Sequence, residues 1–456
     1  MMLRSWLAKH VFYPTQDALR GLGSLRRWRE LEQSQWWSPD QLRAFQDTKL
    51  RQLIRHATSQ TPFYRERFER AFIRAADVRS IDDLSDLPLL LKDDIRDGRE
   101  DMIADSHRSE LMSSCTSGST GSPLIFSVGR RRCGADLAAR IRAHRWFGVC
   151  TGDPVIYLWG SRIETDRQDR LRAIRDWLIN EKLLRAFELS DEQLHGYADK
   201  FLYIKPHALY SYSSTLWRFA QFVHEHRPEL KGVIRRVAFA TGEQLLPQWR
   251  EEIIRYLECS VAEEYGCREG GLIAHECPEE AYHITAENIL VEILDDDGKV
   301  LPSDEEGRVV VTNLDAYAMP FIRYDTGDRA ALRAGECACG RPLPMMWRPT
   351  GRSFEFLETN DGTQVTGVSL SRDLKEIEGL THYRVIQEAR DRVRILAVTN
   401  SHYHRAEGER QMRCFVKARI GDATQVIIEY VDDLPPHASG KYRYIINAIA
   451  ESATSH

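Results

Sequence analysis

Long apolar runs are missing from this sequence. Nowhere do about eighteen apolar residues follow one another, as a membrane-spanning helix requires. The first residues have neither a sustained apolar core nor a small-residue cleavage site, so no secretion signal is expected. Cysteine is also scarce, with nine in 456 residues, well below the density of a disulfide scaffold. These absences predict a cytoplasmic protein.

An excess of one charge is missing too. Lys and Arg number 63 against 68 Asp and Glu, a net charge of −5, so no nucleic-acid partner is expected. The local exception is residues 1–30, with six basic and two acidic side chains. Their tryptophans and basic charge suit contact with an anionic membrane surface, or a helical arm folded onto the body. Pro14, Gly21 and Gly23 interrupt the apolar face and favour the arm.

Short apolar runs alternate with helical stretches through the first two thirds of the chain. Residues 154–159, 237–241 and 261–265 are predicted to be buried strands, and 245–257 a helix between two of them. This alternation indicates an α/β architecture. From residue 288, β-rich runs flank an Asp-Asp-Gly turn and predict antiparallel pairing.

The length and these patterns predict two domains. A large N-terminal domain of mixed sheets and helices covers residues 1–352, with a helical entry segment at 1–100 and a β-rich subdomain at about 284–350. A small, mobile α+β C-terminal domain covers 353–456, with strands expected at 383–388, 392–398 and 425–431.

Residues 113–123, SSCTSGSTGSP, gather hydroxyl side chains and glycines into one loop. Glycines let backbone N–H groups turn toward a phosphate, and Ser and Thr add donors without bulk. The loop is not of the GxxxxGK[ST] type, because no lysine follows its second glycine. Such a loop suits a polyphosphate, although taken alone it is also typical of a linker.

Three further motifs follow: EYGCRE at 264–269, RYDTGD at 323–328 and SGK at 439–441. Together with the loop they resemble, in the same order, the TSGSTGxP, YGxxE, YxTGD and lysine signatures of the adenylate-forming superfamily. That superfamily includes acyl-CoA synthetases, firefly luciferase and the adenylation domains of nonribosomal peptide synthesis. One such motif is typical of a turn or a solvated charge, but four in order are not expected by coincidence.

The resemblance implies binding of ATP and Mg²⁺. A carboxylate that attacks the α-phosphate brings two anions together, so a metal ion, N–H donors and a lysine are needed at the developing charge. The resemblance implies that the ring of Tyr265 lies against adenine, that Glu269 helps to hold Mg²⁺, and that Asp328 accepts both ribose hydroxyls. It also implies that Lys441 reaches the carboxylate and the α-phosphate. The resemblance also assigns catalysis or nucleotide binding to Thr116, Ser117, Gly118, Ser119, Thr120, Gly121, Gly242, Glu243, Gly266 and Arg352.

Within the superfamily the sequence is similar to the phenylacetate-CoA ligase and CapK-like branch over nearly its whole length. The similarity includes RHATSQTPFYRERF, LPLLLKDDIR, HECPEEAYHITAENILVEILDDDGKVLP and ECACGRPLP. One departure is Phe354, where many members carry Asp or Lys as the pivot of domain rotation, so the pivot is expected at Ser353 or Glu355.

Cys277, His283, Cys337 and Cys339 form two pairs that flank the β-rich region. Three thiolates and an imidazole make a closed tetrahedral Zn²⁺ site, and related members show the same arrangement. The alternative is a set of reduced thiols and a surface histidine. His275 is the other candidate imidazole.

The acyl pocket of this fold lies between the central strands and the adenylate. Candidate walls are Trp159, Tyr210 and Ala240, with Gly270 and Gly271 leaving room near the carboxylate. The two aromatic rings suit an aryl acid, and they also suit an ordinary core.

The resemblance implies an adenylate-forming ligase that activates a small aryl or acyl carboxylate as acyl-AMP and transfers it to coenzyme A or another thiol. The alternatives are transfer to an amine, sugar or cofactor hydroxyl in polysaccharide or secondary-metabolite synthesis, and a nucleotide-binding scaffold without turnover. Glu269, Asp328 and Lys441 argue against the scaffold.

Overall fold

The computed structural model describes residues 2–115, 124–159, 169–186, 191–352, 356–360, 364–366, 370, 373–374, 377–434 and 444–449. Internal contacts divide the chain into two units. The first contains Met1–Thr326 and Ala331–Arg348, and the second contains Gly327–Ala330 and Pro349–His456.

The first unit begins with a series of helices. They are α1 (Met2–Leu7), the π-helical turn η1 (Ala8–Phe12), α2 (Tyr13–Arg20), α3 (Ser24–Ser34), α4 (Pro39–Gln60), α5 (Pro62–Arg70), η2 (Ile81–Asp86), α6 (Lys92–Gly98) and η3 (Asp105–Glu110). A reciprocal pair of hydrogen bonds between Ser38 and Gln41 caps α4. Gly21 and Gly23 adopt positive φ and separate α2 from α3, and Leu31 of α3 packs with Ala138 and Ala139.

A nine-stranded sheet forms the centre of the first unit. In spatial order it contains β13 (Leu332–Arg333), β14 (Met345–Met346), β9 (Tyr282–Ile284), β8 (Gly271–Glu276), β7 (Ser260–Cys267), β6 (Val237–Thr241), β5 (Ala208–Tyr212), β3 (Val155–Trp159) and β4 (Glu181–Arg185). The strands from β4 to β7 are parallel, and those from β7 to β13 are antiparallel. The interior strands β5 and β6 are buried along their whole length, which explains their continuous apolar runs.

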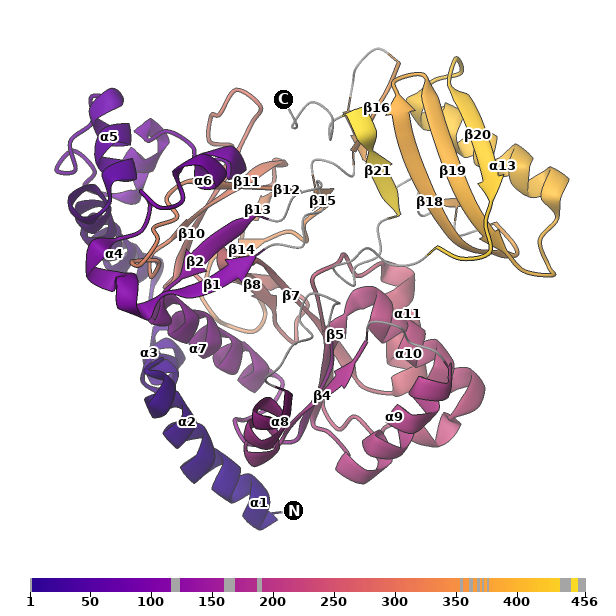
Figure 1. Cartoon of the computed structure of the whole chain (residues 1–456), viewed down its shortest axis with the longest axis horizontal. Helices are drawn as coiled ribbons and strands as arrows, with labels where there is room; N and C mark the ends of the chain where they lie inside the picture. Colours follow the sequence, from indigo (N-terminus) through magenta and orange to yellow (C-terminus); the bar gives the residue numbers. More distant parts are fainter. Residues whose placement is uncertain are drawn as a thin grey trace. The chain divides into compact units, whose positions relative to one another are not determined.

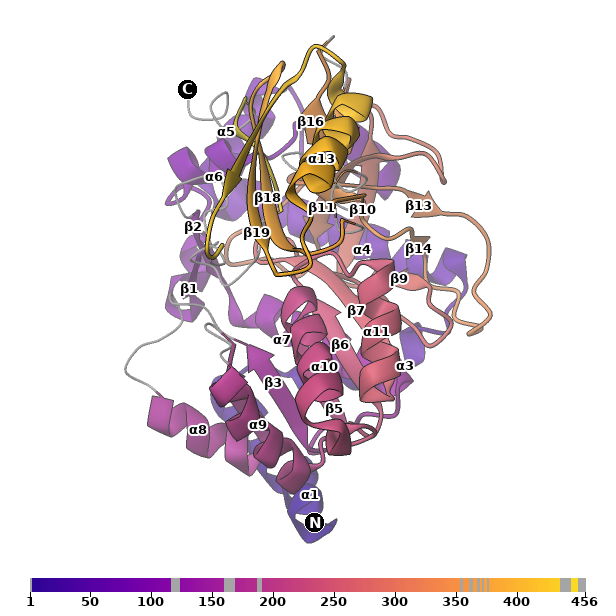
Figure 2. The ribbon, with the colours of Figure 1, turned by 90° about the vertical axis from the view of Figure 1, so that its right-hand side faces the viewer.

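Helices cover both faces of the parallel part of this sheet. Helix α7 (Arg130–Trp146) lies on one face, and α9 (Asp191–Ile204), α10 (Ser213–His226) and α11 (Pro247–Leu257) lie on the other (Figures 1 and 2). Helix α8 (Asp169–Leu178) precedes β4, and the short helix η5 (Pro228–Leu230) follows α10.

The β-rich segment pairs antiparallel, as predicted. β10 (Ile289–Leu294) and β11 (Gly307–Asn313) form a ladder from Ile289 opposite Asn313 to Leu294 opposite Arg308. They continue into β12 (Tyr324–Ala330) and β15 (Gly351–Arg352). Separately, β1 (Met112–Cys115) and β2 (Ile125–Val128) form an antiparallel pair on either side of the predicted phosphate loop.

The second unit has a sheet and a core of its own. Its strands are β16 (Phe356–Glu358), β17 (Gln364–Thr366), β18 (Leu380–Ala389), β19 (Arg392–Thr399), β20 (Gln425–Tyr430) and β21 (Ile445–Asn447), with helix α13 (Arg405–Ile420). The four-stranded sheet has the order β20-β19-β18-β21. Val385, Ile395 and Val416 are fully buried between this sheet and the helix. A separate core is the mark of a domain.

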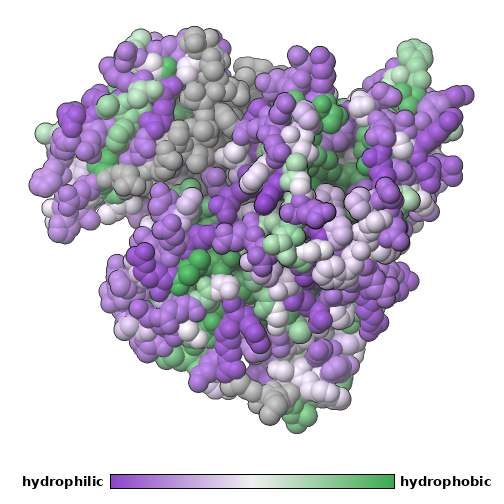
Figure 3. Space-filling model, turned by 180° about the vertical axis from the view of Figure 1, so that it is seen from behind, coloured by the Kyte–Doolittle hydropathy of each residue, from purple (hydrophilic) through white to green (hydrophobic). Residues whose placement is uncertain are grey.

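Within the described residues, no helix combines the length and the apolar character needed to cross a membrane. The face of the molecule in Figure 3 is largely hydrophilic, with apolar side chains in scattered groups.

Candidate active site

Several predicted nucleotide-binding residues lie at the carboxyl ends of neighbouring parallel strands. Gly242 and Glu243 come directly after β6, and Tyr265 and Gly266 lie near the end of β7. The two strands run parallel with Thr241 opposite Glu264, so these segments lie at the same edge of the sheet. In open α/β sheets, ligands bind at this edge.

Glu243 is fixed at the start of α10. Gly242 has a φ of +75°, a left-handed conformation that favours glycine. The backbone N–H of Ser214 donates to the Glu243 carboxylate at 3.0 Å, and the Ser213 hydroxyl donates to the Glu243 carbonyl at 2.8 Å. The carboxylate therefore satisfies a free N–H in the first turn of the helix.

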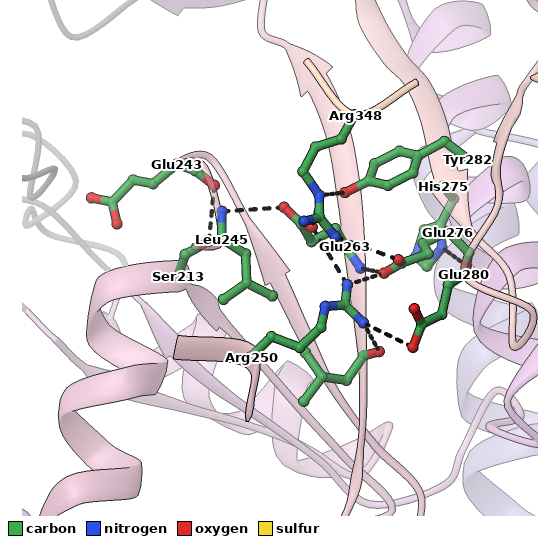
Figure 4. A network of polar contacts seen from close by, with 11 residues as sticks. Ser213, Glu243, Leu245, Arg250, Glu263, His275, Glu276, Glu280, Tyr282 and Arg348 are labelled. Atoms are coloured by element: carbon green, nitrogen blue, oxygen red, sulfur yellow. Dashed lines mark hydrogen bonds and ion pairs between the residues drawn. The ribbon is translucent and has the colours of Figure 1, made fainter. Parts of the chain in front are cut away.

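A buried charge network supports the turn that follows β6 (Figure 4). Glu263 of β7 accepts a hydrogen bond from the Leu245 N–H at 3.2 Å and pairs with Arg348 at 2.7 Å. Arg250 of α11 pairs with Glu263 at 3.4 Å and with Glu276 of β8 at 2.5 Å. Two arginines thus neutralise two buried glutamates, as buried charges require. The network holds α11, β7, β8 and the turn after β6 together.

The second and third motifs meet at Glu269. Its side chain is 5% exposed, and the Tyr324 hydroxyl donates to its Oε1 at 3.2 Å. The neighbouring Arg268 donates from Nη1 to the Cys115 carbonyl at 2.7 Å, where β1 ends and the predicted phosphate loop continues. Residues of three motifs, far apart in the sequence, are therefore joined by two hydrogen bonds.

Some predicted residues lie outside the part of the chain that the structure describes. They are Thr116, Ser117, Gly118, Ser119, Thr120, Gly121 and Lys441, and also Ser353, Phe354 and Glu355 near the expected hinge. For Arg352 only the backbone is described, in β15, where it stands opposite Asp328 of β12. Asp328 is 6% exposed. The ribose candidate and the hinge-region arginine are thus neighbours in one ladder of the second unit.

Tight packing surrounds the glycines of this region. A Cβ added at Gly266 would lie 2.5 Å from the Gly271 carbonyl oxygen, and one at Gly270 would lie 2.8 Å from the Cys267 sulfur. Gly271 has a φ of +103°, and its Cβ would lie 2.7 Å from the Asp136 carboxylate. Packing and backbone conformation therefore explain the lack of a side chain at the predicted pocket residues Gly270 and Gly271.

The predicted aromatic walls lie on the face of the sheet under α7. Trp159 stacks on Tyr212 with 3.9 Å between ring centroids, and Tyr210 lies 5.6 Å from Trp159. Ala240 is fully buried in β6. Tyr210 is 6% exposed, and its hydroxyl donates to Glu264 at 2.5 Å.

Arg140 and Glu264 form a buried ion pair beside these rings. Arg140 of α7 donates two hydrogen bonds to the Glu264 carboxylate, at 2.8 Å from Nε and 2.7 Å from Nη2. Burial alone would raise the pKa of Glu264, but the Arg140 charge and hydrogen bonds outweigh burial and bring the pKa down to about 2. Glu264 is therefore a fixed anion directly before Tyr265.

Comparisons with known proteins agree with this geometry. The chain is 22% identical to Protein CapK of Staphylococcus aureus over 89% of both chains, and 26% identical to the phenylacetate-coenzyme A ligase of Escherichia coli over 87% of this chain and 93% of the ligase. Residues 357–448 match the family model of the CapK C-terminal domain. A crystal structure of 2-hydroxyisobutyryl-CoA ligase in the postadenylation state superposes with a TM-score of 0.73 at 18% identity, covering 93% of this chain and 96% of the ligase.

The chain is a relative of CapK and the phenylacetate-CoA ligases. The resemblance inferred from the four motifs is thereby confirmed, and so is the mixed α/β fold with a smaller C-terminal part. The adenylate-forming fold explains why residues of three motifs converge within the first unit. It brings together segments that are far apart along the chain.

The four predicted metal ligands of this CapK relative are gathered in one place. Their ligand atoms all lie within 4.8 Å of one another, from Cys277 after β8, His283 in β9, and Cys337 and Cys339 in the segment between β13 and β14. The Cys277 and Cys337 sulfurs are 3.6 Å apart, and the Cys339 sulfur is 3.2 Å from the His283 Nε2. The other candidate, His275, lies instead in a cluster with His144 and Glu264.

Sequence reasoning missed the residues that surround the site from outside the motifs. Arg140, Arg250 and Arg348 each neutralise a buried glutamate. A charged residue in a helix or loop is usually solvated, and nothing local in the sequence distinguishes these three. Only the fold of this phenylacetate-CoA ligase relative brings them to their partners.

Proposed function

We propose that this chain uses ATP and Mg²⁺ to activate a small aryl or acyl carboxylate as acyl-AMP and then transfers the acyl group to coenzyme A. The observation that carries this proposal is the hydrogen bond from Tyr324 to the buried Glu269, which joins two of the family's nucleotide motifs. The alignments with phenylacetate-CoA ligases over most of both chains support it.

In this proposal the residues of the chain bind and neutralise the reacting groups. Glu269 is a buried carboxylate, the ligand type that Mg²⁺ prefers, and Mg²⁺ when bound would neutralise phosphate charge. Asp328 would accept the ribose hydroxyls and Tyr265 would lie against adenine. The loop around Thr116 would supply N–H donors to the phosphates, and Lys441 would stabilise the charge that develops during acyl-AMP formation.

We also propose a structural Zn²⁺ on Cys277, His283, Cys337 and Cys339. Zn–S bonds of about 2.3 Å in a tetrahedral site place two sulfurs roughly 3.8 Å apart, and the Cys277 and Cys337 sulfurs are 3.6 Å apart. The His283 Nδ1 lies 3.3 Å from the Leu343 carbonyl, so Nδ1–H can donate there and leave Nε2 for the metal. These distances support a closed site with no position for substrate.

The two units suit the proposed domain roles, residues 1–352 for adenylation and 353–456 as the small mobile domain that carries Lys441. The separate core of the second unit and the match of residues 357–448 to the CapK C-terminal domain support this division. We place the enzyme in the cytoplasm, where ATP and coenzyme A are available.

An amine is a second candidate for the group that accepts the activated acyl group. An amide bond synthetase shares the fold, with a TM-score of 0.54 at 16% identity, so the fold is compatible with amide formation.

ATP–pyrophosphate exchange over a panel of carboxylates tests the first half-reaction. We expect exchange that depends on one class of acid, followed by thioester or amide formation when coenzyme A or an amine is added. Glu251→Gln, an exposed position on α11, is the matched control for carboxylate variants. Absence of acid-dependent exchange from a folded, Mg²⁺-supplied protein would reject adenylation.

A further inference from the structure

A cavity of about 240 Å³ lies within the first unit, beside the edge strands of the large sheet. Its polar and aromatic walls come from three helices and two strands, and include Tyr13, Gln16, Arg140, Tyr157, Trp159 and Glu181. Trp159 is a predicted wall of the acyl pocket. The cavity therefore shares one wall with the predicted acyl pocket, and its other walls include residues of the N-terminal helix α2.

The cavity extends along strands β3 and β4. Trp159 ends β3, and Glu181 begins β4 opposite Val155. Four residues of a strand span roughly 13 Å. The Trp159 end lies at the carboxyl edge of the sheet, where Gly242 and Glu243 follow β6 and Tyr265 lies near the end of β7. The Glu181 end lies at the opposite edge, far from the nucleotide motifs.

Two arginines of the cavity walls, one from α7 and one from α8, already pair with carboxylates. Arg140 is held by Glu264 in two hydrogen bonds, and Arg175 donates to Asp176 at 2.6 Å. A ligand anion at the Glu181 end would have to compete with these carboxylates. The walls from α7 and α8 therefore do not favour a second negative charge on the ligand, and Arg20 of α2 is the remaining cation that lines the cavity.

Two hydrogen-bond acceptors, Glu181 and Gln16, line the cavity. The Glu181 carboxyl interacts with the Tyr157 hydroxyl, and burial raises the pKa of Glu181 to about 7. The Oε1 of Gln16 is buried without a hydrogen-bond partner among the described residues. A buried acceptor without a donor costs free energy, which a ligand or water donor recovers.

We propose that this cavity receives the far end of the substrate acid and that this end carries a hydrogen-bond donor, a hydroxyl or an amino group, bound by Glu181 and Gln16. The inference rests on the proposed function for the carboxylate end. Drug-sized ligands occupy pockets of about 300–1,000 Å³, so this smaller cavity suits a compact acid. The rings of Tyr13, Tyr157 and Trp159 suit a flat or short apolar middle.

Calorimetric titration of the full chain with matched acids tests the proposal. One series is phenylacetate, 4-hydroxyphenylacetate and 4-aminophenylacetate, and the other is hexanoate with its 6-hydroxy and 6-amino forms. In at least one series, we expect a donor-bearing acid to bind at least about tenfold more tightly than the unsubstituted acid. Glu181→Leu should remove this preference, and Gln16→Leu should reduce it. The Glu251→Gln control should keep it.

Glu181→Gln separates the two donors. The amide keeps an acceptor for a hydroxyl or an aromatic amine but cannot carry the negative charge that favours the ammonium group of 6-aminohexanoate. In Glu181→Gln a preference for 6-aminohexanoate should therefore fall, most clearly above pH 7, while a preference for a hydroxy acid persists. Thermal unfolding of each variant verifies that it is folded before titration.

Binding within twofold for all members of both series, or a preference unchanged in folded Glu181→Leu, would overturn the cavity assignment. Pyrophosphate exchange separates this failure from failure of the proposed function. If exchange occurs without a preference for donor-bearing acids, the cavity role is rejected and adenylation stands. If the preference is found without exchange, the cavity role stands and adenylation is rejected.

Discussion

Individual buried charged residues determine the electrostatic environment around the motifs. Glu264 receives two hydrogen bonds from Arg140 and one from Tyr210, and it directly precedes Tyr265, the residue proposed to lie against adenine. His144 and His275 approach the same carboxylate from α7 and β8, and burial lowers the pKa of both. Neutral imidazoles and a paired carboxylate keep this interior close to electrically balanced.

The low pKa of Glu264 predicts a pH dependence of stability. Its folded-state value of about 2 lies below the ordinary value of 4.5. The ion pair therefore stabilises the fold above about pH 4.5, and this contribution, on the order of 3 kcal/mol, is lost as the pH falls toward 2. Denaturant unfolding of Glu264→Gln should show a shallower loss of stability between pH 5 and 3 than the parent. Equal slopes would contradict the pairing.

Lys441 should act on the rate and not on nucleotide binding. A cation at the reacting phosphate is most useful as negative charge develops, so Lys441→Ala should abolish acyl-AMP formation and leave ATP affinity nearly unchanged. Thioester formation from supplied acyl-AMP should survive. Lys299→Ala, at an exposed position, is the control. Normal pyrophosphate exchange by Lys441→Ala would remove the residue from this role.

Asp328 should act on nucleotide binding. A carboxylate that accepts both ribose hydroxyls contributes charge-assisted hydrogen bonds, each worth about 1.5–3 kcal/mol at most. Asp328→Ala should therefore weaken ATP binding about tenfold or more, measured by titration calorimetry. Asp422→Ala, at an exposed position of the second unit, serves as the control. Parental ATP affinity in Asp328→Ala would rule out ribose binding by this residue.

At the scale of elements, several buried strands were predictable from the sequence, whereas the ion pairs that link them to the covering helices were not. Strand β6 is apolar and buried throughout, so a short apolar run between turn residues sufficed to predict it. Arg140 reaches Glu264 across 124 positions, and such a pairing exists only once α7 covers the sheet. The motif residues were identified through resemblance to a known family. Their separation along the chain does not by itself indicate that they lie together in the folded protein.

The cysteine and histidine cluster joins elements at one end of the large sheet. Its ligands come from the β8–β9 region and from the segment between β13 and β14, so a bound Zn²⁺ would cross-link them. Purified protein should contain about one zinc per chain, and the double variant Cys337→Ser/Cys339→Ser should lose it and unfold at a lower temperature. Elemental analysis and thermal unfolding measure both effects.

Cys414→Ser controls for the loss of a thiol, because Cys414 is exposed on α13 in the second unit. It should keep both the zinc and the unfolding temperature. Protein that holds no zinc, or that retains it in the double variant, would leave these residues as ordinary thiols. The rate of the folded fraction should change less than its stability, because a closed site has no position for substrate.

At the scale of the whole molecule, the candidate nucleotide residues are distributed over two separately packed units. Glu243, Tyr265 and Glu269 belong to the first unit, and Asp328 and Arg352 belong to the second. Each unit buries its own apolar residues, such as Leu209 in β5 and Ile395 in β19, both fully buried. The two units therefore have independent sources of stability.

Independent cores predict two unfolding transitions. Truncation of a fully buried Ile or Leu removes apolar contacts and leaves a cavity, at a cost of about 2–5 kcal/mol to the unit that contains it. In scanning calorimetry, Ile395→Ala should lower only the transition of the second unit, and Leu209→Ala only that of the first. Zinc removal by a chelator should act like Leu209→Ala, because all four proposed ligands belong to the first unit. A single transition that both substitutions shift equally would show that the units unfold together.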